Sequence, residues 1–111
     1  MATATFVHDG ESIDYTPGAD VAAGAVIVQV DLVGIAKRPI TANTLGALAV
    51  DGVFDLPKST AGGSAIAVGT TVYWSTGSQQ ATATSAGNKL LGKTIKAAVD
   101  ADTTVRVRLS Q

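Results

Sequence analysis

The chain has 111 residues, and Ala, Thr, Val and Gly together account for 58 of them. Charged residues make up 15% of the sequence, where about 25% is usual for a soluble domain. Because there is no Cys and only one His, the composition excludes a disulfide framework, a thiol nucleophile and a His-rich metal cage. The length predicts one domain over residues 1–111, with a single modest core.

The net charge of −1 conceals an uneven distribution of charge along the chain. Residues 1–36 hold five acids and no Lys or Arg, whereas residues 37–111 hold eight bases and four acids. Solvated turns and strand faces would explain this split, and so would a head-to-tail contact between the acidic edge of one subunit and the basic edge of the next. The candidate subunit-contact residues are Asp9, Glu11, Asp14, Arg106 and Arg108.

The sequence shows no sign of a nucleic-acid or membrane partner. Its Lys and Arg residues are scattered rather than clustered into a basic footprint. The N-terminus lacks the basic and apolar regions of a signal peptide, so we expect synthesis in the cytoplasm. The longest apolar stretch, residues 21–28, is far shorter than the roughly 20 residues that a membrane span needs.

Period-two patterning dominates the chain, and no segment combines a helix start, a 3.6-residue period and a helix stop. Asp9 with Gly10 predicts a hairpin turn, and Asp51 with Gly52 predicts a second hairpin or a bulge. We therefore expect an all-β barrel or sandwich of about eight to ten short strands, with little or no helix. In chain order, the predicted strands are 3–8, 12–15, 25–30, 32–36, 45–50, 53–56, 70–74, 80–84, 90–97 and 104–109.

The last predicted strand alternates most regularly. Val105, Val107 and Leu109 fall on one face and Arg106 and Arg108 on the other. This pattern indicates a half-buried strand whose two arginines face outward.

A short pattern occurs three times, at residues 21–24, 40–43 and 66–69. Each copy places an apolar residue three positions before Gly or Asn, and a β-rich run follows. Gly and Asn tolerate positive φ, so each copy predicts a turn that leads into a strand. The irregular spacing of the copies argues against a solenoid and favours a repeated corner in a barrel or sandwich.

The search for catalytic motifs assigns no catalytic, cofactor-binding or metal-binding residue. There is no P-loop, and the Gly62, Gly63 and Ser64 stretch is typical of a flexible loop. Nor does the chain contain a G-x-S-x-G elbow. His8 beside Asp9 could shuttle a proton, but no nucleophile or metal is evident for it to serve, and an exposed strand residue explains it as well.

Two groups of acids could gather around a hard cation, which takes oxygen ligands. Neither group has the spacing of a calcium loop, and acids are common in turns. The groups are Asp9, Glu11 and Asp14, and Asp51 with Asp55.

Tyr73 and Trp74 form the most informative aromatic pair. Neighbouring residues on a strand point to opposite faces, so we expect Trp74 in the core and Tyr73 facing outward. The alternative is an exposed module that stacks glycans on Trp74, Tyr73 and Tyr15.

The chain as a whole resembles the phage and prophage capsid cement, or decoration, proteins, a family first described as a domain of unknown function. The resemblance rests on the order and spacing of several blocks. They are A-T-F-V-H-D-G-E-S-I-D-Y-T-P at 4–17, A-D-V-A-A-G at 19–24, D-L-V-G-I-A at 31–36, L-G-A-L-A-V-D-G-V-F-D-L-P-K at 45–58, V-G-T-T-V-Y-W at 68–74, G-N-K-L-L-G at 87–92 and T-V-R-V-R-L at 104–109.

This resemblance implies a β-rich, non-enzymatic structural protein on the outside of a phage head. The family pattern implies a homotrimer at local three-fold positions that ties major capsid proteins together, made in the bacterial host. Some relatives carry a recombinase label, which the missing P-loop does not support. At Asn43 we would expect Gly from the family pattern, but Asn also suits positive φ.

Residues 1–5 are a candidate extended arm. The segment is polar and lacks turn residues, so it could add a strand to a capsid sheet by main-chain hydrogen bonds, or it could simply fray. The candidate capsid-contact residues are Met1, Ala2, Thr3, Ala4 and Thr5. A module on the virion that recognises glycans or the host surface remains the alternative function.

Overall fold

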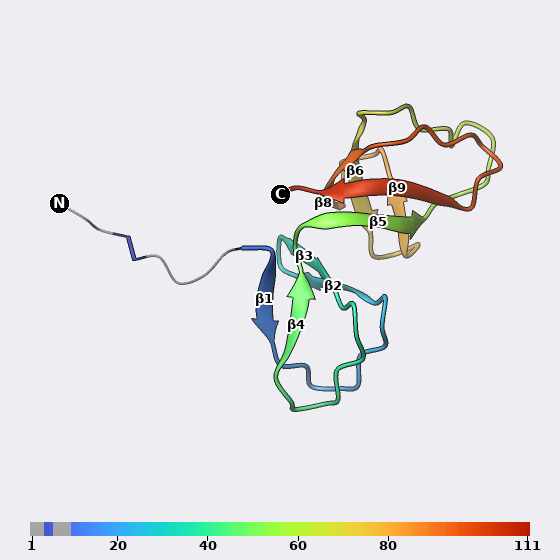
Figure 1. Ribbon diagram of the computed structural model, residues 1–111. Coiled ribbons are helices and arrows are strands. Elements are labelled where there is room, and N and C mark those ends of the chain that lie inside the picture. Colours follow the sequence, from blue (N-terminus) through green and yellow to red (C-terminus); the bar gives the residue numbers. More distant parts are fainter. Residues whose placement is uncertain (1–3, 6–9) are drawn as a thin grey trace.

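A computed structural model describes residues 4–5 and 10–111 of the chain. These residues form nine strands and no helix (Figure 1). The strands are β1 (Ser12–Tyr15), β2 (Val26–Gln29), β3 (Leu32–Ile35), β4 (Gly46–Ala49), β5 (Gly52–Pro57), β6 (Thr71–Ser75), β7 (Gln80–Thr82), β8 (Lys89–Thr94) and β9 (Thr104–Leu109).

The strands form two antiparallel sheets. The first has the order β1-β4-β3-β2, and the second has the order β5-β9-β8-β6-β7. Figure 1 shows the first sheet below the second, with the chain passing between them from β4 to β5. The sheets are not closed into a barrel, so the prediction of an all-β fold is confirmed in its sandwich-like form.

Of the two predicted hairpins, the one at Asp51 and Gly52 does not form, and the one at Asp9 and Gly10 lies partly outside the described residues. The hairpin at Asp51 and Gly52 is wrong, because β4 pairs with β1 and β3 whereas β5 pairs with β9. Gly52, at φ 108°, lets the chain change sheets at this point. The predicted strand 3–8 lies mostly outside the described residues, and its two described positions, Ala4 and Thr5, belong to no strand.

The main core lies between the two sheets. From the first sheet, Val33 and Ile35 of β3 enter a cluster built mostly by the second sheet. The side chains of Val33, Leu91 and Val107 are fully buried there. A smaller cluster around Leu48 and Ile40 covers the other face of the first sheet. β3 therefore contacts apolar side chains on both of its faces and joins the sheets.

The three corners predicted from the sequence are present. Gly24, Asn43 and Gly69 have φ values of 85°, 63° and 80°, and each precedes a strand. Asn43 is one of three non-glycine residues with positive φ among those described, and its short amide side chain tolerates that conformation.

The corners are paired across each sheet by backbone hydrogen bonds. In the first sheet, Val21 and Ile40 exchange two N–H···O bonds of 2.8 and 2.9 Å. In the second sheet, Ile66 and Ala98 do the same at 2.9 and 2.8 Å. The sequence pattern does not include the corner at Ala98, because Ala101 stands three positions after it, where the pattern has Gly or Asn.

Further hydrogen bonds repeat at the same relative positions. Gly24 N–H donates to Ala36 O, and Ala36 N–H donates to Ala25 O. The equivalent bonds join Gly69 N–H to Thr94 O and Thr94 N–H to Thr70 O. Both sheets are thus built on one plan, in which β1, β2, β3 and β4 correspond to β5, β6, β8 and β9. β7 is an addition to the second copy of the plan.

Lys58 is a buried cation that binds two of the loops together. The residue is only 4% exposed. Its Nζ donates to the backbone oxygens of Ser59, Val99 and Asp102 at 2.7, 2.9 and 3.1 Å. These three carbonyl oxygens accept the hydrogen bonds that the ammonium group would otherwise donate to water. The side chain therefore ties the end of β5 to the loop before β9.

We predict that Lys58→Met lowers the free energy of unfolding by about 2–4 kcal/mol, because several buried carbonyls lose their donor. Urea unfolding measures this change. The matched control is Lys37→Met, at an exposed position, which should change stability by less than about 0.5 kcal/mol. Equal stability of the two variants would contradict the role assigned to Lys58.

Candidate functional site

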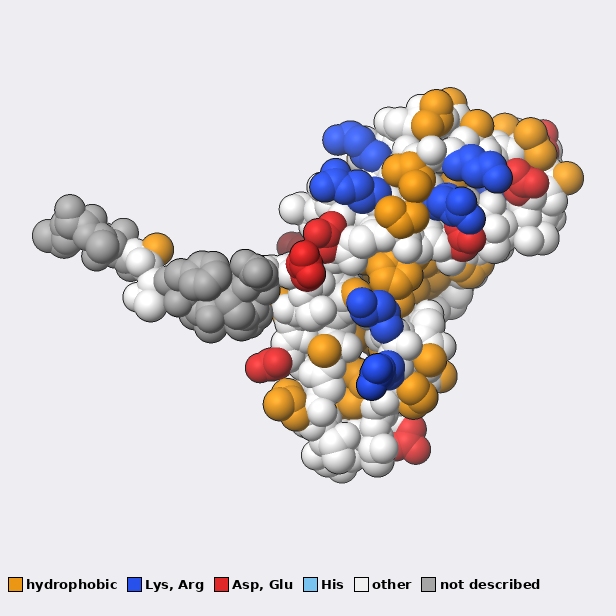
Figure 2. All heavy atoms as spheres, in the orientation of Figure 1, with side chains coloured by type: hydrophobic (Ala, Val, Ile, Leu, Met, Phe, Trp, Pro, Cys, Tyr) orange, Lys and Arg blue, Asp and Glu red, His pale blue; other side chains and the backbone are white. Residues whose placement is uncertain are grey.

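The outward face of the second sheet is basic. Val105, Val107 and Leu109 of β9 are buried and Arg106 and Arg108 are exposed, as the alternation predicted. Figure 2 shows several Lys and Arg side chains together on the upper part of the molecule, where Figure 1 places β5 and β9. This face is the largest gathering of like charge in that view.

Arg106 is neutralised within the chain. It lies opposite Asp55 of β5, and its Nε and Nη2 donate to the two carboxylate oxygens at 2.9 and 3.2 Å. This hydrogen bond lowers the pKa of Asp55. The nearby positive charges of Arg106 and Lys96 lower that pKa further. Both side chains are about half exposed, so the pair is a surface ion pair of modest strength.

Arg108 has no such partner. It lies directly opposite Lys93 of β8, and like charges at opposed positions of a sheet destabilise it. Over residues 4–5 and 10–111, the ion pairs are Asp31 with Lys89 and Asp55 with Arg106. Lys93 could not be predicted to face outward from the sequence, because the pairing of β6 with β8 shifts register between Val72 and Tyr73.

The acidic candidates lie in the other sheet. Glu11 and Asp14 are exposed at β1, an edge strand of the first sheet, and Asp9 lies outside the described residues. Asp14 faces Ala47 across the ladder, whereas Asp55 faces Arg106 in the second sheet. The carboxylate of Asp14 therefore has no basic residue opposite it on the neighbouring strand.

The acids do not gather into a metal site. Within the part of the chain that the structure describes, no three His, Asp or Glu side chains lie close enough to hold an ion. His8 lies outside that part.

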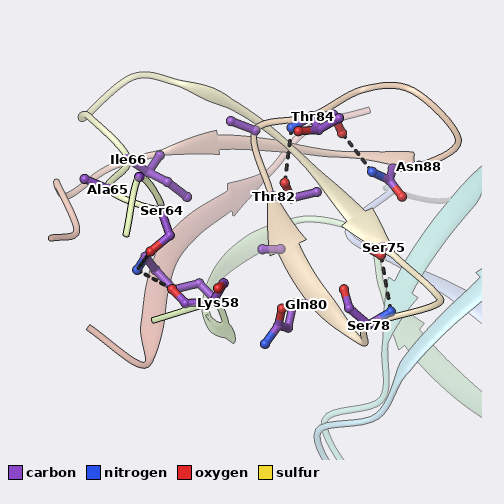
Figure 3. A pocket seen from close by; sticks show the side chains of 14 residues that line it. Lys58, Ser64, Ala65, Ile66, Ser75, Ser78, Gln80, Thr82, Thr84 and Asn88 are labelled. Atoms are coloured by element: carbon purple, nitrogen blue, oxygen red, sulfur yellow. Dashed lines mark hydrogen bonds between the residues drawn. The ribbon is translucent and has the colours of Figure 1, made fainter. Parts of the chain in front are cut away.

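A polar hollow of about 270 Å³ lies between β7 and the loop that follows Lys58. Figure 3 shows Ser64 beside Lys58 at one end, and Thr82, Thr84 and Asn88 at the other. Most of these polar groups already bond to nearby chain: Asn88 donates to Thr84 O at 2.9 Å, and Ser64 donates to Ala61 O. Ser64 Oγ donates from this Gly-rich loop to Ala61 O and to Asp100 O.

Trp74, Tyr73 and Tyr15 do not form a shared platform. Trp74 is 2% exposed and lies in the main core, as predicted, which removes it from the glycan-stacking alternative. Tyr73 is half-buried in the second sheet, whereas Tyr15 packs against the smaller cluster of the first sheet.

Of the candidate arm, Ala4 and Thr5 are described, and both are exposed. Met1, Ala2 and Thr3 lie outside the described residues.

The model of the phage cement protein family matches residues 7–109. No curated protein and no solved structure matches the chain. Within residues 4–5 and 10–111, no helix has the length and apolarity needed to cross a membrane. Because the family model covers nearly the whole sequence, the chain belongs to the phage cement protein family.

Proposed function

We propose that this protein is a non-enzymatic cement protein that decorates the outside of a phage head and bridges neighbouring major capsid proteins. The family match over residues 7–109 carries this proposal, because membership supports a structural role at the phage capsid. A homotrimer at local three-fold positions is the arrangement that we expect on the shell, with synthesis in the host cytoplasm.

The two sheets suit a bridging role because contacts within the chain hold them together. A core shared by both sheets and the carbonyl bonds of Lys58 keep its surfaces in fixed relative positions. A rigid body that binds only the assembled lattice stabilises that lattice by mass action.

Residues 1–5 remain our candidates for contact with the capsid. Ala4 and Thr5 are exposed and belong to no strand, so their main-chain groups are available to another chain. Extended segments bind sheet edges through main-chain hydrogen bonds. Two kinds of acceptor present such an edge: a strand of the shell, and a strand of a neighbouring copy.

The contact between subunits is proposed from charge. Among residues 4–5 and 10–111, Arg108 forms no ion pair and lies opposite Lys93, and Asp14 lies opposite Ala47. In a head-to-tail contact, Asp9, Glu11 and Asp14 of one copy would face Arg108 and Arg106 of the next. Such a heterologous contact can close into a ring of three.

We predict that heads carrying the protein survive heating and osmotic shock better than heads without it, because bound copies must dissociate before the shell opens. Counting intact heads by electron microscopy measures survival, and gel densitometry measures bound copies. Equal survival with no bound copies would refute the proposed function.

We predict that Arg108→Glu weakens association between subunits roughly tenfold, the size of effect expected at a charge-complementary contact. Sedimentation velocity on the free protein and occupancy on heads both report it. Asp14→Arg should weaken association similarly, and the double variant should recover part of the loss. Lys37→Glu, which changes an exposed base in the segment between β3 and β4, is the control and should leave association unchanged. If Arg108→Glu behaves like the control, the charge contact is wrong.

A further inference from the structure

The repeated plan of the two sheets leaves one strand edge uncovered. In the second sheet, β7 pairs with the outer edge of β6 through Gln80, Ala81 and Thr82. The strand that corresponds to β6 in the first sheet is β2, and β2 is the last strand of that sheet. The first sheet therefore has one strand fewer at the equivalent position.

At Val26 and Val28, the main-chain N–H and C=O groups of β2 point away from β3 and out of the sheet edge. β2 and β3 form a hairpin with a two-residue turn, with Gln29 opposite Leu32 and Val28 opposite Val33. In such a hairpin the closing pair is hydrogen-bonded, so Val26 and Val28 direct their N–H and C=O groups away from β3. Across residues 4–5 and 10–111, no hydrogen bond joins these groups to another part of the chain.

The opposite edge of the hairpin supports this reading of the register. Val33 faces Val28, so its main-chain groups must also point out of the hairpin. They do, because the Gln111 side chain donates to Val33 O at 2.6 Å and accepts from Val33 N–H at 2.9 Å. On that side the C-terminal residue takes the place of a missing ladder partner.

The edge of β2 also lacks the usual protection against pairing. Its sequence, Val26–Gln29, contains no charge and no Pro, and three of its four residues are β-branched. Edge strands of this kind readily accept another strand. Val30, which follows, is 83% exposed and adds an apolar side chain at the end of the edge.

The sequence supplies a matching strand. Ala81–Thr84 has the sequence A-T-A-T, and its first two residues lie in β7. Residues 2–5 have the same four-residue sequence. We propose that residues 2–5 of a neighbouring copy pair with the free edge of β2, as β7 pairs with β6, and complete a five-stranded first sheet.

The added strand comes from a second copy, because the edge of β2 lies far from the start of β1 in the same chain. β1 and β2 lie at opposite edges of the first sheet, about 14 Å apart, and a strand beyond β2 lies roughly 5 Å farther. The seven residue steps from Thr5 to Ser12 extend to at most about 25 Å. A chain from the start of β1 to the far edge of β2 would need about 19 Å of this length along a straight path, which β4 and β3 occupy. A neighbouring copy has no such constraint.

The inference rests on the proposed function only in placing copies side by side on the shell. It is tested by cross-linking, for which the absence of Cys is an advantage. Thr3→Cys and Gln29→Cys variants, carrying tags of different mass, are mixed at high concentration and also bound together to heads. Mass spectrometry then counts mixed disulfide dimers. Thr3→Cys with Ala101→Cys, at an exposed loop of the second sheet, is the control pair.

We expect mixed dimers from the first pair and few from the control. Val28→Pro in the acceptor removes the outward N–H and should lower the yield roughly tenfold, the factor for one lost main-chain hydrogen bond. Val28→Thr keeps that N–H and should leave the yield unchanged. Deletion of residues 2–5, which lie outside the described sheets, should abolish association through this edge without affecting folding.

Three results would overturn the inference. The first is an equal yield from Val28→Pro and Val28→Thr. The second is an intramolecular disulfide in the dilute double variant, which would show that a chain covers its own edge. The third is loss of head binding on deletion of residues 2–5 with no mixed dimers in solution or on heads, which would assign the arm to the shell.

If heads are stabilised without mixed dimers, this inference alone fails; if mixed dimers form but heads are not stabilised, the proposed function fails.

Discussion

The paired corners are the constraint on which the rest of the structure depends. Val21 with Ile40, and Ile66 with Ala98, each exchange two backbone hydrogen bonds at the end of a sheet. Each exchange fixes the chain just before or after a strand. Three of the four corners also contain a residue with positive φ, namely Gly24, Asn43 and Gly69, which is one reason why a chain with so little chemical variety contains so much Gly.

Comparison of the two copies of the plan also shows where the two sheets differ. The same ladder position holds Asp14 opposite Ala47 in the first sheet and Asp55 opposite Arg106 in the second. One carboxylate is thus paired and the other is free. The outer strand β6 is covered by β7, whereas the outer strand β2 is open. In both comparisons the first sheet has the unfilled position, and these are the two positions at which we propose that a neighbouring copy binds.

Much of this fold follows from local patterns in the sequence. The alternation of Val105 to Leu109 gave the buried and exposed faces of β9, and the Gly and Asn spacing gave three of the corners. Features that depend on distant partners did not follow. Asp51 and Gly52 look like a hairpin turn, but β4 finds its partner in β1, far back along the chain. No local pattern marks Lys58, whose acceptors include Val99 and Asp102.

We propose that this protein binds the outside of an assembled phage head and connects its subunits. Cryo-electron microscopy of heads mixed with the protein is the decisive measurement, because the image gives position and stoichiometry together. We expect added density outside the shell at local three-fold positions, with each copy touching more than one major capsid protein and its neighbouring copies. Heads that show no added density, at a protein concentration sufficient to fill every position, would contradict it.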